Sequence, residues 1–278
     1  MIQDISPHIY DNQYRPQPPE KDSIALYYEG HGILLKKTQE GIIFPRFRDL
    51  ERLNEEIYQD YIYLFTIDEE RYYLVNEINR ERLSEFTLEN TEVFRMAEPQ
   101  FRAFAGITGY QLFNWYQSHK YCGRCGHTMK MDGKERMLFC EECHNMEFPK
   151  ICPAVIIGVT DGNKLLLSKY ADRAFKKYAL LAGYTEIGET VEETVKREVM
   201  EEVGLKVKNI RYYKSQPWSF TDTLLMGFYC DLDGENQITL DKEELALAEW
   251  FEREDIPVKS SRDSLTNEMI MKFKNGEV

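Results

Sequence analysis

Hydrophobic and polar positions change their spacing several times along the chain, most clearly from Pro149 onward. Apolar runs at 154–160 and 164–169 flank Asp161-Gly162-Asn163, a sequence typical of a hairpin turn. Residues 191–203 instead place apolar side chains at helical intervals, as do residues 264–273. Further patterns predict strands at 178–182, 207–214, 224–231 and 249–251, with a short helical turn at 243–248. This mixture predicts an α/β/α sandwich around a mixed sheet.

The N-terminal part of the chain has a different pattern, which predicts a separate α+β domain at residues 1–97. Short apolar or aromatic runs predict strands at 24–29, 33–37, 61–67 and 71–78, and residues 49–57 carry a helical pattern. Residues 98–120 then predict one long helix with an aromatic face. We expect this helix to link the first domain to the C-terminal part of the chain, and its aromatic side chains to pack in a core or dimer interface.

Four cysteines form two Cys-x-x-Cys pairs, Cys122 with Cys125 and Cys140 with Cys143. Two such knuckles at this spacing are typical of a tetrahedral Cys₄ zinc site. Because four protein ligands leave no open position, we expect one structural zinc ion per chain, within a ribbon at residues 121–148. A redox-active dithiol is the rival interpretation of either pair, but it does not explain why both are present.

The pattern with the clearest chemistry lies at residues 183–205. Glu198 and Glu202 are four residues apart, so they share one face of the predicted helix, and Arg197 and Glu201 lie beside them. Placing like charges at this spacing costs a few tenths of a kcal/mol per pair, which a bound cation would offset. Oxygen ligands suit Mg²⁺ or Mn²⁺. The alternative interpretation is an acidic, solvated helix.

Composition and charge narrow the class of protein. The 278 residues are 42% hydrophobic and 13% aromatic, which is enough for one large or two modest cores. The net charge of −13 argues against broad binding to nucleic acid or to an anionic membrane. It does not exclude a polyphosphate site, because bound cations invert the local field.

The compartment is predicted from the cysteines and from apolar runs. No run of eighteen apolar residues occurs, so we expect no membrane-spanning helix, and the N-terminal residues do not predict a secretory signal. Cys152 and Cys230 lie in or beside apolar runs, which is typical of buried free thiols. Unpaired thiols and a zinc-type cysteine pattern favour the cytoplasm.

The segment that begins at Gly183 resembles the Nudix box, Gly-x5-Glu-x7-Arg-Glu-aliphatic-x-Glu-Glu-x-Gly-aliphatic, at every fixed position. A zinc ribbon precedes it, and the sequence Ser-Gln-Pro-Trp-Ser-Phe follows it at residues 215–220. Together these features resemble the NADH pyrophosphatase, or NudC-like, family of Nudix hydrolases. The resemblance implies a Nudix fold for residues 149–278, hydrolysis of NAD(H) to NMN(H) and AMP, removal of NAD caps from RNA, and a homodimer.

The resemblance also implies roles for particular residues. Metal ligation maps to Glu198, Glu202 and Glu243 with the Ala182 carbonyl, although a one-residue shift would make Glu244 the third carboxylate. Catalysis involves the same helix, with Glu202 or Glu198 as the base, supported by Glu201, Arg197 and Glu189. The residues expected to contact substrate are Glu135, Phe148, Tyr184, Gln216, Pro217, Trp218, Ser219, Phe220, Thr221, Asp222 and Thr223.

Departures from the family pattern leave other substrates open. Ser219 and Thr221 stand where the family has prolines, so the backbone there is less restricted. Thr223 replaces a serine of the family and keeps its hydroxyl group. ADP-ribose or a diadenosine polyphosphate is therefore an alternative substrate. A third interpretation is a zinc-ribbon binding module with a degenerate hydrolase domain, but that predicts a broken glutamate set, whereas Glu189, Glu198, Glu201 and Glu202 are all present.

Overall fold

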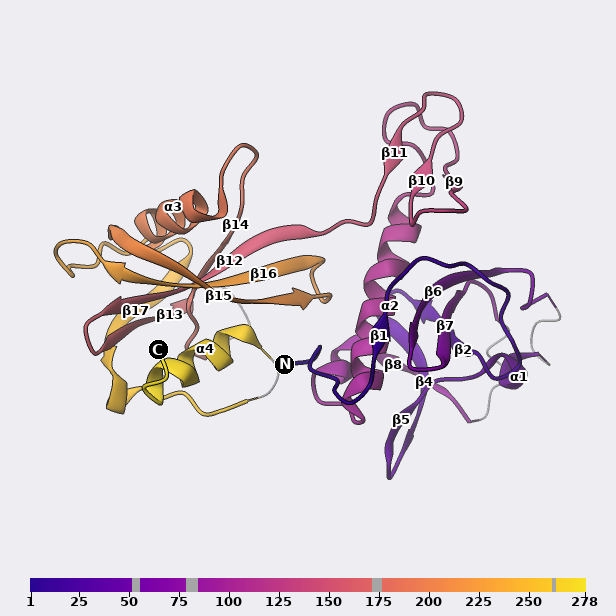
Figure 1. Ribbon diagram of the computed structural model, residues 1–278, viewed down its shortest axis with the longest axis horizontal. Helices are drawn as coiled ribbons and strands as arrows, with labels where there is room; N and C mark the ends of the chain where they lie inside the picture. Colours follow the sequence, from indigo (N-terminus) through magenta and orange to yellow (C-terminus); the bar gives the residue numbers. More distant parts are fainter. Residues whose placement is uncertain (52–55, 79–84, 172–176, 262–263) are drawn as a thin grey trace. The chain divides into compact units, whose positions relative to one another are not determined.

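The computed structural model describes residues 1–51, 56–78, 85–171, 177–261 and 264–278. The chain forms two compact units, shown in Figure 1. The C-terminal unit contains Met1, residues 151–218 and residues 222–278, and the N-terminal unit contains residues 2–150 and 219–221. No helix in the described ranges is long and apolar enough to cross a membrane.

The C-terminal unit is built on one mixed six-stranded sheet. Its path is β15-β16-β12-β13-β17, and β14 pairs with β12. The long central strand β12 runs parallel to β16 but antiparallel to β13 and β14. The strands are β12 (Cys152–Asp161), β13 (Lys164–Tyr170), β14 (Leu181–Tyr184), β15 (Val207–Trp218), β16 (Thr223–Leu232) and β17 (Leu245–Glu252).

One helix covers each face of this sheet. Alternate residues of β12 enter different hydrophobic clusters, since Val155 and Ile157 pack with helix α3 (Val191–Val203), whereas Ile156 packs with helix α4 (Leu265–Lys274). That alternation follows from the two-residue period of a strand. Figure 1 shows α3 and α4 on opposite sides of the sheet. The domain is therefore the expected α/β/α sandwich.

Local sequence fixes both ends of α3. The Thr190 hydroxyl accepts a hydrogen bond from Glu193 N, and the Glu193 carboxylate accepts one from Thr190 N, which forms a capping box. Gly204 ends the helix with φ of +68°, a left-handed conformation that favours glycine. Between the caps, Val195 and Val199 face the sheet and are fully buried. This packing sets which side of α3 carries its glutamates.

The N-terminal unit combines small sheets with one long helix. A four-stranded sheet has the order β1-β6-β7-β2, and a second sheet joins β3, β4, β5 and β8. Helix α2 (Gln100–Ser118) buries Phe104, Tyr110 and Trp115 in the main hydrophobic cluster, so the prediction that its aromatic residues form a core is confirmed. The remaining elements are β1 (Tyr10–Asp11), β2 (Ile24–Leu26), β3 (Tyr28–Glu29), β4 (Gly32–Thr38), β5 (Gly41–Ile43), α1 (Phe47–Leu50), β6 (Tyr61–Ile67), β7 (Glu70–Val75), β8 (Thr87–Asn90) and η2 (Thr91–Arg95).

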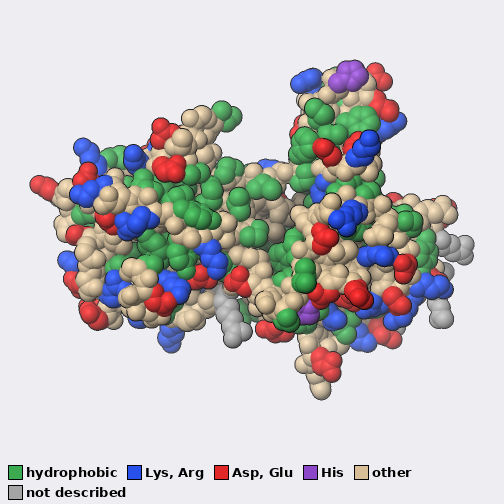
Figure 2. All heavy atoms as spheres, viewed as in Figure 1, with side chains coloured by type: hydrophobic (Ala, Val, Ile, Leu, Met, Phe, Trp, Pro, Cys, Tyr) green, Lys and Arg blue, Asp and Glu red, His purple; other side chains and the backbone are tan. Residues whose placement is uncertain are grey.

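The ribbon after α2 is a three-stranded sheet of order β11-β10-β9. Its strands are β9 (Lys130–Met131), β10 (Leu138–Phe139) and β11 (Met146–Glu147). Leu138 is buried in the main cluster of the N-terminal unit, whereas Met146 and Phe148 are exposed. Hydrophobic side chains accordingly reach the ribbon surface in Figure 2. The division of the chain at 1–97, 98–120, 121–148 and 149–278 stays a prediction.

Two predicted elements differ from the structure. The helical turn predicted at 243–248 is wrong from Leu245 onward, because β17 pairs there with β13 from Lys164 to Tyr170 and is followed by η3 (Arg253–Asp255). Pairing with a neighbouring strand outweighs the helix propensity of Leu and Ala in that segment. The helix predicted at 49–57 overlaps α1 only at its start, and residues 52–55 lie outside the described residues.

Candidate active site

Arg197 organises the acidic side chains of α3 and of the loop before it. Its guanidinium donates to both carboxylate oxygens of Glu189, from Nε at 2.5 Å and from Nη2 at 2.9 Å. Nη1 donates to Glu198 Oε1 at 2.8 Å and to Glu201 Oε2 at 2.9 Å, and Nη2 also reaches the Tyr184 carbonyl at 2.9 Å. One arginine therefore holds three carboxylates and a strand end in fixed positions.

Glu198 lies in a space that only glycine can provide. Glu198 is 8% exposed, and its carboxyl group packs over Gly183 near the end of β14. A Cβ atom placed on Gly183 would lie 1.9 Å from the carboxyl carbon of Glu198. The first glycine of the motif therefore leaves room for this carboxylate, a close approach that any other residue would block.

Glu202 follows Glu198 by one helical turn and is 2% exposed. Its backbone carbonyl accepts a hydrogen bond from Asp241 N at 2.9 Å, which attaches the segment before β17 to the end of α3. Asp241 in turn accepts a bond from Glu243 N at 2.8 Å, and the Glu244 carbonyl accepts one from Ala171 N. The structure thus holds Glu243 and Glu244 in one short turn close in the chain to this attachment.

The pKa values of Glu198 and Glu189 are shifted in opposite directions. Burial raises the pKa of Glu198, and the charges of Glu201 and Glu244 add to that rise, although the hydrogen bond from Arg197 opposes it. The hydrogen bond from Arg197 lowers the pKa of Glu189 to about 2. The Glu189 carboxylate is therefore fixed in its charged form as a partner of Arg197, whereas Glu198 holds its charge less firmly until a cation arrives.

The Glu189 pair predicts a pH-dependent contribution to stability. Because the folded-state pKa lies below the ordinary glutamate pKa of 4.5, the contribution is full above pH 4.5 and is lost as pH falls toward 2. We expect the difference in free energy of unfolding between wild type and Glu189→Gln, measured with urea, to shrink over this range. In an Arg197→Met background the difference should be smaller but should persist, because Glu186 N and Thr194 Oγ1 also donate to the Glu189 carboxylate. A difference that grew on acidification would contradict this assignment.

The hairpin between β15 and β16 carries several residues expected to contact substrate. Gln216 is fully buried, and its Oε1 accepts a hydrogen bond from Leu265 N at 2.7 Å, so its side chain holds the start of α4 against β15. The buried Thr223 hydroxyl lies 3.2 Å from the hydroxyl of Tyr184, whose residue is 52% exposed. Pro217 is exposed, Trp218 is partly buried, and Asp222 has a positive φ of 56°.

Other expected substrate residues belong to the N-terminal unit. Ser219 is buried, Thr221 is exposed, and Phe220 packs against the main cluster of that unit with its ring 4.2 Å from the guanidinium carbon of Arg95. Glu135 and Phe148 are exposed on the ribbon. Ala182, whose carbonyl is a predicted metal ligand, lies in the C-terminal unit and pairs with Ile156 in the central sheet.

The four cysteines of the ribbon form a compact cluster that fits zinc. Cys122 Sγ lies 3.5 Å from Cys143 Sγ, Cys125 Sγ lies 3.4 Å from Cys140 Sγ, and all four sulfur atoms lie within 4.8 Å of one another. A tetrahedral site with zinc–sulfur bonds of about 2.3 Å has edges of about 3.8 Å. In the described part of the chain, no other group of three or more such ligands gathers within that limit, the glutamates included.

Sequence reasoning missed several supports of this site. Thr194 Oγ1 donates to Glu189 Oε2 at 3.0 Å, and Thr239 N donates to the Val203 carbonyl at 2.9 Å. The first contact joins two residues within the motif itself, so the place of Thr194 in the first turn of α3 was an available signal. The second joins segments far apart in sequence, which a pattern along one segment does not reveal.

The segment that carries this cluster is similar to known proteins. Residues 150–272 match the family described as NUDIX domain. The NAD-capped RNA hydrolase NudC of Klebsiella pneumoniae is 42% identical over 151 residues, which are 54% of this chain and 58% of that protein. The protein of the same name from Photorhabdus laumondii is 38% identical over 162 residues, 58% of this chain and 63% of that protein. The match thus spans about three fifths of these relatives.

A solved Nudix hydrolase from Nitrosomonas europaea is 25% identical, covers 50% of this chain and 80% of its own, and superposes with a TM-score of 0.43. The carboxylate cluster on α3 lies within residues 150–272, the segment that matches the NUDIX domain family.

Proposed function

We propose that this protein hydrolyses the pyrophosphate bond of NAD(H), giving NMN(H) and AMP, and that it removes NAD caps from RNA 5′ ends. The observation that carries the proposal is the Arg197-centred cluster, in which Glu198 and Glu202 share the buried edge of α3 inside a Nudix domain. The names of the relatives from Klebsiella and Photorhabdus support the choice of substrate.

The donor set fits a hard divalent cation. Glu198 and Glu202 supply carboxylate oxygens, Ala182 supplies a carbonyl, and Glu243 or Glu244 supplies the third carboxylate from the turn attached to α3. Oxygen-only ligands suit Mg²⁺ or Mn²⁺. When bound, such ions neutralise phosphate charge and lower the pKa of water.

The protein groups then perform orientation and proton transfer. A water oxygen attacks one phosphorus, the bond from that phosphorus to the bridging oxygen breaks, and the water proton passes to a carboxylate. Glu202 or Glu198 is the proposed acceptor of that proton, since the two lie one turn apart on α3. Arg197 fixes the orientation of Glu198 and Glu201, and Glu189 fixes Arg197 in turn.

Flat rings of the substrate require aromatic partners. Tyr184, Trp218, Phe148 and Phe220 are the proposed ones, and stacking of a base on such a ring contributes roughly 1–3 kcal/mol. Glu135 and the loop at 216–223 complete the proposed set. A homodimer is also proposed, and the cytoplasm is the proposed compartment, because thiolate zinc ligands need reducing conditions.

Gly183→Ala is expected to disturb the cluster directly. The added methyl group would overlap the Glu198 carboxyl group, so that side chain must move, and a misplacement of about 1 Å can lower the rate by about 10²-fold. Gly158→Ala is the matched control. Its methyl group meets the Tyr229 ring at 2.8 Å on the same sheet, so we expect lost stability but unchanged kcat. Equal kcat for both variants, measured on NADH, would contradict the account.

The proposed activity is tested by incubating the pure protein with NADH and Mn²⁺ and resolving the products. We expect NMNH and AMP in equal amounts. Intact NADH would refute the proposal, and nicotinamide with ADP-ribose would show a different bond being cut.

A second candidate function keeps the reaction but changes the substrate. Ser219 and Thr221 replace prolines of the family motif, so the loop that is proposed to contact the substrate is less restricted. A panel of NADH, NAD-capped RNA, ADP-ribose and diadenosine polyphosphate separates these possibilities. A kcat/KM at least about tenfold higher for ADP-ribose would favour the alternative, a difference of about 1.4 kcal/mol in transition-state binding.

A further inference from the structure

The loop between the two cysteine pairs of the ribbon is closed by its own hydrogen bonds. Asp132 Oδ1 accepts bonds from Lys134 N at 2.7 Å and from Glu135 N at 2.8 Å. Asp132 N donates to the Met137 carbonyl at 3.0 Å, and Met137 N donates to the Glu135 carbonyl at 2.9 Å. Because the backbone on both sides of Glu135 is fixed, any displacement of this loop displaces Glu135 with it.

Arg136 leaves this loop and enters the body of the N-terminal unit. Its Nη2 donates to the Leu64 carbonyl of β6 and to Asn12 Oδ1 at 3.2 Å. The guanidinium carbon lies 5.1 Å from the centre of the Tyr14 ring, a cation–π contact. The Tyr14 hydroxyl donates back to the Asp132 carbonyl at 3.4 Å. The loop is thus joined to residues more than fifty positions earlier in the chain, at both Asp132 and Arg136.

These contacts specify position more than they add stability. Within the described residues no carboxylate pairs with Arg136, and its Nη1 is buried without a hydrogen-bond partner. Removing a cation from water without a carboxylate partner is unfavourable, so an apolar side chain could fill this space at lower cost. The arginine nevertheless has a property that an apolar residue lacks, because its planar fork fixes both distance and direction.

Arg136 was not singled out by the sequence motifs. The cysteine spacing explains the zinc cluster, and the family resemblance points to the neighbouring Glu135. The alternative is that Arg136 only stabilises the packing of the ribbon. A purely stabilising contact would affect unfolding, but it would have no reason to affect substrate affinity through one particular neighbour.

We propose that Arg136 is a positioning residue that sets the place of Glu135, so that the N-terminal domain acts on substrate affinity through this loop. This inference rests on the proposed function, in which Glu135 contacts the dinucleotide. It also gives the N-terminal domain a role, because the Arg136 side chain contacts Asn12, Tyr14 and Leu64 of that domain.

The test is a double-mutant cycle on NADH hydrolysis. Arg136→Ala should raise KM about 3- to 30-fold with kcat within about twofold, since it acts on binding alone. In a Glu135→Ala background the same change should alter KM by less than about twofold, because the residue it positions is gone. Arg136→Lys should fall between wild type and Arg136→Ala. Equal effects of Arg136→Ala in both backgrounds, or a fall in kcat with unchanged KM, would overturn the proposal.

Controls separate positioning from folding. Arg124→Ala removes an exposed ribbon arginine whose side chain makes no hydrogen bond or ion pair within the described residues, and should leave KM unchanged. Zinc content should stay at one per chain in all variants. If Arg136→Ala fails to fold, Tyr14→Phe removes only the bond to Asp132 and should raise KM in the same direction, and an unchanged KM there would count against the proposal.

A readout without substrate keeps this inference separate from the proposed function. Hydrogen exchange at the amides of Glu135 and Met137 should be faster in Arg136→Ala than in wild type, whatever the protein hydrolyses. Unchanged exchange would refute the positioning role. If wild type leaves NADH intact, the proposed function fails, and the cycle is run on whichever nucleotide of the panel is cleaved.

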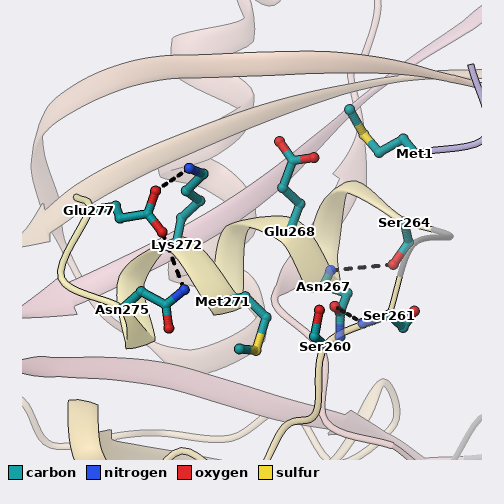
Figure 3. Close-up of a pocket in the computed structure, with 10 residues that line it drawn as sticks. All are labelled: Met1, Ser260, Ser261, Ser264, Asn267, Glu268, Met271, Lys272, Asn275 and Glu277. Carbon is teal, nitrogen blue, oxygen red and sulfur yellow. Dashed lines mark hydrogen bonds and ion pairs between the residues drawn. The ribbon is translucent and has the colours of Figure 1, made fainter. Parts of the chain in front are cut away.

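The cavity on the outer side of α4 carries no comparable inference. Its volume is about 230 Å³, and its lining mixes polar and apolar side chains drawn from α4, Met1 and the serines before the helix (Figure 3). Asn267 N donates there to the Ser264 hydroxyl and the Lys272 ammonium pairs with Glu277, so these groups already have partners.

Discussion

Replacing Glu202 by glutamine is expected to lower kcat for NADH hydrolysis by about 10²- to 10⁴-fold, the usual contribution of a general base. The substitution keeps the shape of the side chain but removes its charge and its basic oxygen. Glu202 is 2% exposed and lies one turn from Glu198 on the same face of α3. In the wild type the two carboxylates therefore repel each other until a cation binds between them. Without metal, the variant should therefore be as stable as wild type or slightly more stable.

The matched control is Glu192→Gln. Glu192 is an exposed glutamate in the first turn of the same helix, outside the Arg197 cluster, so its loss should weaken only the interaction with the helix dipole, by about 0.3–1 kcal/mol. We expect kcat of this variant to match wild type. Thermal unfolding with and without Mn²⁺ completes the comparison, because added metal should stabilise wild type more than Glu202→Gln. Equal kcat for wild type and Glu202→Gln would contradict the proposed role of α3.

Loss of the zinc cluster is expected to have the largest effect on stability. Cys140 is fully buried, and Met129 and Leu138 are the buried apolar residues that the ribbon adds beside its cysteines to the main hydrophobic cluster of the N-terminal unit, so the ribbon has little apolar core of its own. Zinc binding by small domains is worth about 10–16 kcal/mol and is coupled to folding. Cys140→Ser should therefore lose the bound zinc and lower the unfolding midpoint of the N-terminal unit.

Cys152→Ser provides the control for that experiment. Cys152 is a partly buried thiol at the start of β12, outside the cluster, so the variant should keep one zinc per chain by metal analysis. A chelator should convert wild type to the behaviour of Cys140→Ser. If Cys140→Ser kept its zinc and its unfolding midpoint, the four sulfur atoms would not form the structural site.

The parts of this molecule that could be predicted from sequence are those whose information is local. The glutamates of α3 and the two cysteine knuckles lie within a few residues of one another, so spacing alone places them on one face or in one cluster. The capping box at Thr190 and the left-handed Gly204 similarly mark the ends of α3 in the sequence itself.

The parts that could not be predicted depend on pairing between distant segments. Residues 245–248 have good helix formers, but β13 requires a strand there. The hydrogen bond from Leu265 N to the Gln216 side chain joins residues 49 positions apart, so no local pattern reveals it. The contacts of Arg136 with Asn12, Tyr14 and Leu64 could not be predicted either, since they join segments that share no local pattern.

The central claim is that the carboxylates of α3 hold divalent cations against a diphosphate. The most direct measurement is a crystal structure of the protein with Mn²⁺ and a dinucleotide, read from the anomalous signal of manganese. The account predicts manganese peaks beside Glu198 and Glu202, bridged to the phosphates. A dinucleotide bound with no manganese at α3, or manganese bound only elsewhere, would contradict it.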